Sequence, residues 1–439
     1  MELKRVAEEI CRKAVERALP DAAVRRALEE IQIGKGRLFV IAVGKAGWEM
    51  GRTAAEVLGD RIDTGIVITK YHHSRGEISG FAIFEAGHPV LDENGVKATE
   101  YVLEAVKDLS KEDQVLLLLS GGGSALFEKP LLPLEELKDI SQQLLACGAD
   151  IVEINTIRKR LSAVKGGRFA KACAPAQVHS VLLSDVVGDH PGMIASGPAC
   201  EDASTCEEAL ELVEKYKLRL SERVLELLGQ ETPKRLDNIC VTLTGGVSLL
   251  CRFVAEECEK RGYPPVILTD SMDCEAREAG RFLASAARYH RGKGHKIALI
   301  AGGETIVHLT GSGKGGRNQE LALAAAEGIA GLEGVAIAAM GSDGTDGPTD
   351  AAGGCVDGYS KNALEKQGIR IYEVLRRNDA YHGLEQCGGL IVTGSTGTNV
   401  NDIALALIAP PCAKRTEAEV ENEDRGLKAA GKPASFYGC

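Results

Sequence analysis

The sequence lacks the features of a membrane protein and of a nucleic-acid-binding protein. No apolar stretch approaches the ~18 residues that a membrane-spanning helix needs. Positive charge is also scarce, because 52 Lys and Arg residues are set against 63 Asp and Glu residues and leave a formal net charge of −11. A surface of this sign repels nucleic-acid phosphates and anionic lipid headgroups. We therefore expect neither a nucleic acid nor a membrane among the partners of the chain.

Several short motifs are missing as well. The 13 cysteines include no C-x-x-C pair, so we expect no zinc or dithiol site and interpret most cysteines as small buried side chains in a reducing compartment. The first residues carry charges throughout and lack the apolar core of a signal peptide, which favours the cytoplasm. Neither the Walker pattern G-x-x-x-x-G-K-[ST] nor the nucleophile elbow G-x-S-x-G occurs. These absences argue against a Walker-type phosphate loop and against an α/β-hydrolase.

Apolar runs that alternate with helical periods indicate the fold class. At 439 residues the chain is long enough for two or three domains. An amphipathic pattern predicts a helix over 2–19, and strands are expected at 38–43, 65–69, 115–119, 181–184, 239–243, 266–268, 297–301, 335–339 and 390–393. Most of these runs are apolar throughout and alternate with helical stretches, which is typical of parallel sheets covered on both faces. The sequence therefore predicts an α/β protein.

The candidate boundary between domains is a polar, proline-containing stretch around 228–234. We accordingly expect a first domain at 1–233 and a C-terminal region at 234–409. Residues 410–439 are charged and lack an apolar period, so we expect them to form a flexible tail.

Glycine is enriched, at 51 of 439 residues or about 12% against an average near 7%, and it gathers directly after the predicted strands. The loops concerned lie at 44–47, 120–124, 184–190, 244–246, 302–304, 341–347 and 393–399. Ligands of an open α/β sheet bind beyond the carboxyl ends of its strands, and glycine lets backbone N–H groups turn toward an anion. A single loop of this kind is more simply explained as a tight turn between a strand and a helix. Seven such loops in one chain favour a site for a polyphosphate.

Two glycine motifs differ in what they indicate. Ser-Gly-Gly-Gly-Ser at 120–124 offers three flexible amides and two hydroxyls after an apolar strand, which makes it the most phosphate-like loop. Gly311 to Gly316 satisfies G-x-G-x-x-G, with Glu333 about 20 residues beyond Gly313, as in a dinucleotide site. The apolar run at 305–309 follows the preceding strand so closely that we expect a hairpin rather than the opening of a βαβ unit. This expectation argues against the dinucleotide interpretation.

Basic side chains in these loops are candidate ligands of an anion. Lys45 directly follows a buried-type strand, from where its ammonium could reach a phosphate or a carboxylate. Arg317 begins the helix after a glycine-rich turn and could hold an anion at that helix N-terminus. The basic stretch at 153–168, which includes Arg158 and Lys165, is either a substrate contact or a solvated helix face.

Acidic side chains at strand ends are candidates for metal binding and proton transfer. Asp185, Asp189, Asp343 and Asp346 follow predicted strands, and Glu304 follows a glycine pair. A kinase uses such carboxylates to hold Mg²⁺ and to accept the proton of a hydroxyl group. Aspartate is also routine in turns, so both interpretations stay open for each residue.

Taken together in chain order, these motifs resemble the class II glycerate 2-kinases, which pair an N-terminal glycerate kinase domain with a C-terminal MOFRL domain. The segments that carry the resemblance are 43–47, 85–89, 119–124, 153–158, 164–168, 183–185, 195–198, 302–305, 315–320, 343–350 and 396–402. The resemblance implies a Rossmann-like doubly wound sheet in the first domain, a MOFRL domain at about 295–405, and an active site in the cleft between the two domains. It also implies phosphorylation of D-glycerate at its 2-hydroxyl by ATP with Mg²⁺.

The resemblance assigns Lys45 and Arg317 to the catalytic site, and Asp189 is our choice of base. The expected cofactor-binding residues are Ser120, Gly121, Gly122, Gly123, Ser124, Lys165, Gly302, Glu304, Asn318, Thr398 and Asn399, and the expected metal ligands are Asp185, Asp343 and Asp346. An NAD(P)H-dependent hydroxypyruvate reductase is the alternative enzyme, and a nucleotide sensor is the non-catalytic alternative. The oligomeric state stays open, with a homodimer as one arrangement.

Overall fold

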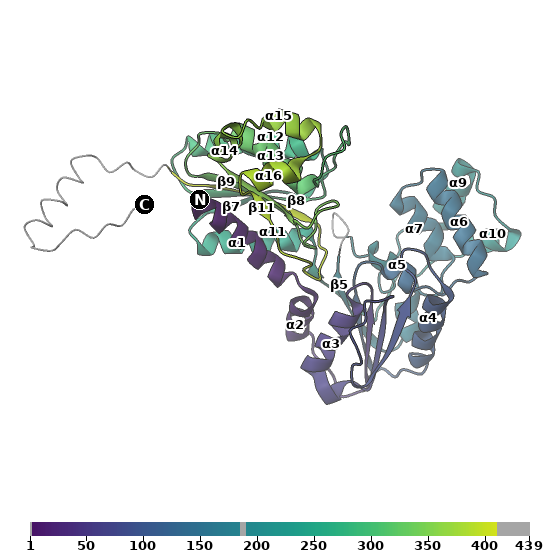
Figure 1. Cartoon of the computed structure of the whole chain (residues 1–439). Coiled ribbons are helices and arrows are strands. Elements are labelled where there is room, and N and C mark those ends of the chain that lie inside the picture. The colour runs from purple at the N-terminus through teal and green to yellow at the C-terminus, as the bar shows by residue number, and fades with distance from the viewer. Residues whose placement is uncertain (1, 185–189, 411–439) are drawn as a thin grey trace, which may run out of the picture.

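The computed structural model describes residues 2–184 and 190–410, which form two α/β domains, each built on a six-stranded sheet (Figure 1). The first sheet has the order β3-β2-β1-β4-β5-β6 and is parallel throughout. Its strands are β1 (Leu38–Val43), β2 (Thr64–Lys70), β3 (Phe81–Ala86), β4 (Gln114–Leu119), β5 (Gln177–Leu183) and β6 (Ile239–Gly245). This strand order confirms the expected doubly wound, Rossmann-like domain.

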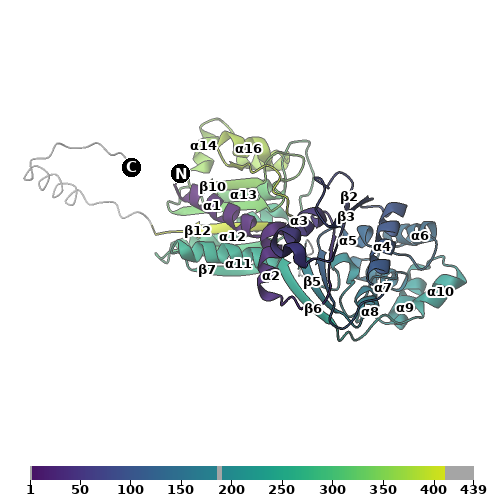
Figure 2. The same cartoon turned by 90° about the horizontal axis from the view of Figure 1, so that it is seen from below.

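Helices cover both faces of the first sheet, as its uniformly apolar central strands require. Every residue of β1 is buried, and alternate side chains enter two different cores, with Val40 in one and Ile41 in the other. The helices are α3 (Gly47–Leu58), α4 (Glu93–Ala105), α5 (Gly123–Leu126), α6 (Leu134–Ala146), α7 (Ile151–Arg160), α8 (Arg168–Cys173), α9 (Cys206–Tyr216) and α10 (Glu222–Leu228). Helices α6, α7, α9 and α10 lie at the end of the domain that faces away from the second domain (Figures 1 and 2).

The second sheet has the order β11-β10-β9-β12-β8-β7 and is mixed. Its strands are β7 (Pro265–Met272), β8 (Ile297–Gly303), β9 (Val335–Gly341), β10 (Gly353–Asp357), β11 (Leu390–Ile391) and β12 (Asp402–Ile408). Strand β12 runs antiparallel to both β8 and β9. The expectation of a parallel sheet is therefore wrong for this domain, because an apolar strand buried on both faces has the same residue pattern in either direction.

The helices of the second domain lie in two layers. On one side, α12 (Ala276–Arg291) packs against α13 (Arg317–Gly328) over the sheet, and the short helices α14 (Ser360–Glu365), α15 (Ile371–Arg376) and α16 (Ala380–Gln386) complete that core. On the other side lies α11 (Val247–Lys260). No helix in the described part of the chain combines the length and the apolar character needed to cross a bilayer.

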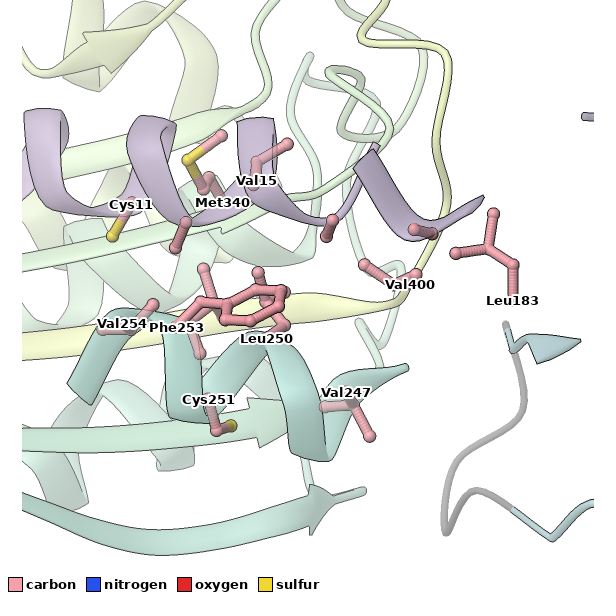
Figure 3. Packing of buried hydrophobic residues seen from close by; sticks show 14 of the residues in the cluster. Cys11, Val15, Leu183, Val247, Leu250, Cys251, Phe253, Val254, Met340 and Val400 are labelled. Carbon is pink, nitrogen blue, oxygen red and sulfur yellow. The ribbon is translucent and has the colours of Figure 1, made fainter. Parts of the chain in front are cut away.

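The N-terminal helices connect the two domains. Helix α1 (Glu2–Arg17) packs against α11 and the second sheet, so that Cys11 and Val15 face Phe253, Leu250 and Met340 (Figure 3). Helix α2 (Pro20–Glu30) packs on α3 and β6 of the first domain. The turn between α1 and α2 is fixed by hydrogen bonds from both sides, because Thr398 Oγ1 donates to the carbonyl of Ala18 and Arg26 donates to the carbonyls of Arg17 and Thr244.

The expected division at residue 233 differs from this packing at two places. Strand β6 follows residue 233 in the chain but pairs with β5 in the first sheet, while α1 precedes it and packs on the second domain. The polar stretch at 228–234 is a surface loop between α10 and β6, and such loops also occur inside domains. We propose instead that the first domain ends with β6 and that α1 belongs to the second. The expected tail lies outside the described residues, apart from Pro410.

Candidate functional site

The strand order of the first domain creates a switch point between β1 and β4, where ligands of doubly wound sheets bind. The two loops that leave these strands are hydrogen-bonded to each other. The Ser120 N–H donates to the carbonyl of Val43 over 2.9 Å, the Lys45 N–H donates to the carbonyl of Gly121 over 2.8 Å, and the Ala46 N–H donates to Ser120 Oγ over 3.1 Å. The loop after β1 and the loop at 120–124 therefore form one rigid unit.

Gly44 allows this close approach of the two loops. Its φ is +122°, and a Cβ atom at this position would lie 2.2 Å from Ser120 Oγ and 2.5 Å from the Ser120 carbonyl oxygen. The site therefore requires glycine here for both conformation and space.

Gly44→Ala should lower the free energy of unfolding by more than about 1–3 kcal/mol, the usual strain of a disfavoured backbone conformation, because the clash with Ser120 adds to that strain. Chemical denaturation measures the loss. Gly59→Ala is the matched control, since Gly59 also has a positive φ, +51°, but has open space around it. Equal losses in the two variants would show that contact with Ser120 plays no part.

A cavity of about 590 Å³ lies at the switch point and receives residues from both domains. Six expected site residues line it, namely Lys45, Ser120, Gly121, Asp343, Thr398 and Asn399. The first three follow strands of the first sheet, and the others belong to loops beside β9 and β12 of the second. This part of the candidate site thus lies between the domains, as expected.

The walls of this cavity carry groups that suit an anion. The side chain of Lys45 is exposed, and within the described part of the chain its ammonium has no hydrogen-bond or ion-pair partner. Within the same residues, the N–H group of Gly121, which lines the cavity, and that of the adjacent Gly122, which does not, also have no acceptor. Gly122 adopts a φ of +91° and passes close to the stem of Lys45. Unpaired amides beside a free ammonium are the arrangement that binds phosphate oxygens.

Several residues of this cavity were not predicted from the sequence. His72, His73 and Arg75 follow β2, and Trp48 lies on α3. His73 Nδ1 donates to the carbonyl of Lys45 over 3.1 Å, and the Trp48 indole donates to the carbonyl of Gly76. The position of His72, His73 and Arg75 in the sequence could have revealed them. They follow the predicted strand at 65–69, and this strand pairs with β1, which Lys45 follows.

A second cavity, of about 1100 Å³, lies in the second domain beyond the carboxyl ends of β8 and β9. Glu304, Arg317 and Asp346 line it, and Asp343 lines both cavities. The structure therefore places Lys45 and Arg317 in different cavities, with Asp343 where the two meet.

Arg317 is held by two carboxylates. Its guanidinium donates from Nε and Nη2 to the two oxygens of Asp402 and from Nη1 to Glu304. Burial alone lowers the pKa of Arg317, but the bonds and charges of Asp402 and Glu304 outweigh burial and raise the pKa above its ordinary value. Burial raises the pKa of Asp402, and the opposing effect of Arg317 offsets this rise only in part. Each terminal nitrogen of the guanidinium retains one N–H for a ligand.

Asp346 caps the helix that begins at Arg317. Its Oδ1 accepts the N–H of Asn318 over 3.1 Å and its Oδ2 accepts the N–H of Gln319 over 2.9 Å. Burial raises the pKa of Asp346 to about 6, against the opposing effect of these two N–H groups. Both oxygens are occupied by the helix N-terminus, so the side chain has a structural task here.

The raised pKa of Asp346 predicts a pH dependence of stability. Because the folded-state pKa lies above the ordinary value of 3.8, protonation favours the folded state, and this contribution is present below pH 4 and lost as the pH rises through 6. A shift of about two pKa units corresponds to about 3 kcal/mol. The stability of the wild type relative to Asp346→Asn should therefore increase by about that amount as the pH falls from 7 to 4. Denaturation curves across this range measure it, and a constant difference would contradict the prediction.

Six expected cofactor-binding residues line neither of these cavities: Gly122, Gly123, Ser124, Lys165, Gly302 and Asn318. Gly302 is buried in β8, where a Cβ would lie 2.6 Å from Cys251 Sγ and from Val247 Cγ2 on α11. Asn318 is buried and donates from Nδ2 to Asp346. Lys165 is buried behind the 120–124 loop. Asp185 and Asp189 lie outside the described residues.

No group of three or more His, Cys, Asp or Glu side chains in residues 2–184 and 190–410 could hold a metal ion. Of the two described candidates, Asp346 is occupied by the helix N-terminus, as above. The carboxylate of Asp343 accepts only the N–H of Thr345, over 2.9 Å, within the same residues. Mg²⁺ is often held by one or two carboxylates together with substrate phosphates, and the Asp343 carboxylate fits that use.

The G-x-G-x-x-G segment does not open a βαβ unit. Strand β8 ends at Gly303, and residues 304–316 form an irregular loop in which Ile306 makes a single isolated bridge with Glu275. The hairpin expected at 305–309 is therefore wrong, because this run turns toward β7 and α12 instead of back onto β8. The glycines serve close packing, since a Cβ on Gly311 or Gly313 would collide with the backbone of Arg377.

Comparison with known proteins gives matches over most of the chain. A domain of unknown function (DUF4147) matches residues 6–229, and the MOFRL family matches residues 297–402. D-glycerate 2-kinase of Thermotoga maritima is 51% identical over 412 residues, which cover 92% of this chain and 98% of that protein. A putative hydroxypyruvate reductase of Agrobacterium vitis is 38% identical and covers 91% of this chain and 95% of its own length. The crystal structure of glycerate kinase from Thermotoga maritima matches with a TM-score of 0.89 at 50% identity, over 93% of this chain and 100% of that one.

Proposed function

The chain belongs to the glycerate 2-kinase family with a MOFRL domain, and from that premise we propose that it transfers a phosphoryl group from ATP to the 2-hydroxyl of D-glycerate. The products are 2-phosphoglycerate and ADP. The observation that carries this function is the cavity at the β1/β4 switch point, where a free ammonium and unpaired loop amides meet residues of the second domain. Phosphoryl transfer depends mainly on positioning and on charge stabilisation, which are what such a cavity supplies.

The triphosphate of ATP is proposed to lie along the loop at 120–122. Its oxygens would accept the N–H groups of Gly121 and Gly122, and Lys45 would neutralise charge that develops on the transferring phosphoryl group. The small loop side chains leave the amides accessible. In this arrangement the phosphoryl group points from the first domain toward Asp343.

Glycerate is proposed to approach from the second domain. Its carboxylate would bind the two N–H groups of Arg317 that Asp402 and Glu304 leave free. The fixed orientation of the guanidinium would then place the 2-hydroxyl near Asp343, where the two cavities meet. This division of labour requires both domains for catalysis.

Mg²⁺ is proposed to bind at Asp343, which has carboxylate oxygens to spare. When bound there, Mg²⁺ would supply positive charge that neutralises part of the negative charge of the phosphates. Asp189 remains our proposed base and Asp185 a proposed second ligand. Both follow β5 in the chain, and Leu183 at the end of β5 lines the first cavity.

Hydroxypyruvate reduction is the weaker alternative, because the G-x-G-x-x-G segment lacks the preceding strand of a dinucleotide site. Purified protein with D-glycerate and MgATP should form ADP only when glycerate is present. A parallel reaction with hydroxypyruvate and NADH or NADPH, followed by nicotinamide absorbance, should show no change. Absorbance loss without ADP formation would favour the reductase, and no reaction in either assay would favour the nucleotide sensor.

Two finer expectations also remain proposals. A cytoplasmic location is supported by the cysteines, since no disulfide joins those in the described residues, as in a reducing compartment. A homodimer is the other proposal, and light scattering of the purified protein tests it.

A further inference from the structure

A cluster of buried charges lies directly behind the phosphate-binding loop. The loop continues into α5, whose residue Ser124 has a carbonyl oxygen that accepts two cationic donors, Lys165 Nζ at 2.8 Å and Arg158 Nη2 at 3.1 Å. Lys165 Nζ also donates to the carbonyl of Phe127 over 3.1 Å. Lys165 thus links Ser124, at the end of the loop, to Phe127, directly after α5.

The cluster carries a net positive charge. Lys165 Nζ lies 3.2 Å from Glu128 Oε2, and both side chains have no exposed surface. Arg158 lies 3.9 Å from the same carboxylate and is 19% exposed. One anion therefore faces two cations in a largely buried place, so the surplus charge is screened less than a surface charge.

A second set of contacts holds the same loop from the other side. Ser124 Oγ lies 3.2 Å from Ser196 Oγ, and Ser196 Oγ donates to Asn155 Oδ1 over 2.8 Å. A Cβ on Gly123 would lie 2.7 Å from the Cβ of Ala195, so this side of the loop is closely packed. Asn155 and Arg158 lie on α7, and therefore this helix contacts the loop through both sets.

Resting on the proposed function, we infer that Lys165, with Glu128 and Arg158, is a positioning residue for the donor triphosphate. It fixes the 120–124 loop through the carbonyls of Ser124 and Phe127 and places a buried positive charge behind the amides that receive the phosphates. It acts through the loop and does not itself line either cavity.

The chain contains a matched control for this role. Lys159 lies on α7 and pairs with Asp202 over 3.0 Å, with side chains that are only 10% and 2% exposed. Asp202 is further bonded to Thr232 and Ser204, and within the described residues neither Lys159 nor Asp202 has a side-chain hydrogen bond to the 120–124 loop. Lys159→Met and Lys165→Met both break a buried ion pair, but only the second touches the loop.

The first test compares the two methionine variants in the glycerate-dependent assay. Loss of a charge-assisted hydrogen bond of about 1.5–3 kcal/mol corresponds to about a tenfold effect or more. We therefore expect Lys165→Met to raise the KM for MgATP about tenfold, with the KM for glycerate changed less than twofold. Lys159→Met should leave both KM values within twofold, whatever it does to Tm. Equal effects of the two variants on the KM for MgATP, or no effect of either, would overturn the inference.

The second test uses pH and a variant that keeps the lysine. Burial lowers the pKa of Lys165 to about 8. The charge of Arg158 lowers this pKa too, and Glu128 offsets the two effects only in part. Within the described residues, the charged groups that face Lys165 are Arg158 on α7 and Glu128 in the segment after α5. In the wild type the KM for MgATP should rise above pH 8, and in Glu128→Gln this rise should begin at a lower pH, because the charged lysine has lost its anion. An unchanged or higher inflection would overturn the inference even if Lys165→Met failed to fold.

The outcomes separate this inference from the proposed function. Wild-type protein that forms no ADP with glycerate contradicts the function. Titration of each variant with MgATP by calorimetry then still tests the role of Lys165, since the expected weakening concerns ATP binding alone. If Lys165→Met bound MgATP with the affinity of the wild type, the inference about Lys165 would be overturned.

Discussion

Replacement of Lys45 by alanine should lower kcat for glycerate-dependent ADP formation by about 10²–10³, the usual cost of removing one group that stabilises a developing charge. The ammonium is exposed, and in the described residues it has no partner that its loss would leave unpaired. The backbone of Lys45 keeps its bond to Gly121 in any variant. Tm should therefore change by less than a few degrees while turnover falls. Steady-state kinetics and thermal denaturation of the same preparation measure both effects.

Lys70→Ala is the matched control for Lys45→Ala. Lys70 ends β2, the strand next to β1, but it does not line the cavity at the switch point. Its removal takes the same charge from the same edge of the sheet, and kcat should stay within about twofold, as for a rim charge. Unchanged turnover in Lys45→Ala, or equal losses in the two variants, would reject the role of Lys45 at the transferring phosphoryl group.

The first half of this site could be predicted from the sequence because its determinants are local. An apolar run ending in Gly44-Lys45 predicts a buried strand and a loop at its carboxyl end, and the run before Ser120 predicts the same. β1 and β4 have the predicted positions, and their pairing brings the two loops together. His72 and His73 carry the same positional signal but belong to no familiar motif, so the sequence alone did not single them out.

The second domain was predicted less well because its architecture depends on contacts between distant segments. Strand β12 is as apolar as a parallel strand, and only its pairing with β8 and β9 reveals its antiparallel direction. The amphipathic pattern of α1 predicts a helix correctly but cannot specify that its apolar face packs against α11, more than 200 residues later. Strands β3, β10 and β12 were missed, and β10 begins with two glycines, which strands disfavour.

Residue type also failed to distinguish ligand contact from structural tasks inside the motifs. Gly302 and Asp346 lie in segments shared with the family, yet both have structural tasks. Gly302 leaves the space in which α11 packs against the sheet, and Asp346 caps α13. Lys165 has the charge of a phosphate ligand and is buried behind the loop at 120–124. A motif specifies which residues are required together, whereas the direction of each side chain follows from the packing around it.

Arg317→Ala should abolish measurable turnover and also lower the free energy of unfolding by about 3 kcal/mol, the lower end of the range for breaking a buried ion pair, because the guanidinium is one-third exposed. The loss leaves Asp402, whose side chain is only 4% exposed, without its cation. Without Arg317 the pKa of Asp402 should rise further, so the deficit should be largest at neutral pH and shrink as acid protonates the carboxyl group. Denaturation at pH 5 and pH 8 measures this change, and an equal deficit at both values would contradict the pairing.

The double variant Arg317→Ala with Asp402→Ala separates stability from catalysis. Removing the carboxylate together with its partner eliminates the unpaired buried charge, and so the double variant should recover much of the stability that Arg317→Ala loses. Turnover should stay absent, because the group proposed to hold the glycerate carboxylate is still missing. The free energy of unfolding of Arg317→Lys should lie between those of Arg317→Ala and the double variant. An ammonium supplies positive charge to Asp402 but cannot bond both of its oxygens in one plane, as the guanidinium does. Recovery of turnover in the double variant would show that Arg317 supports the fold alone, and the glycerate carboxylate would then have to be bound by other cations.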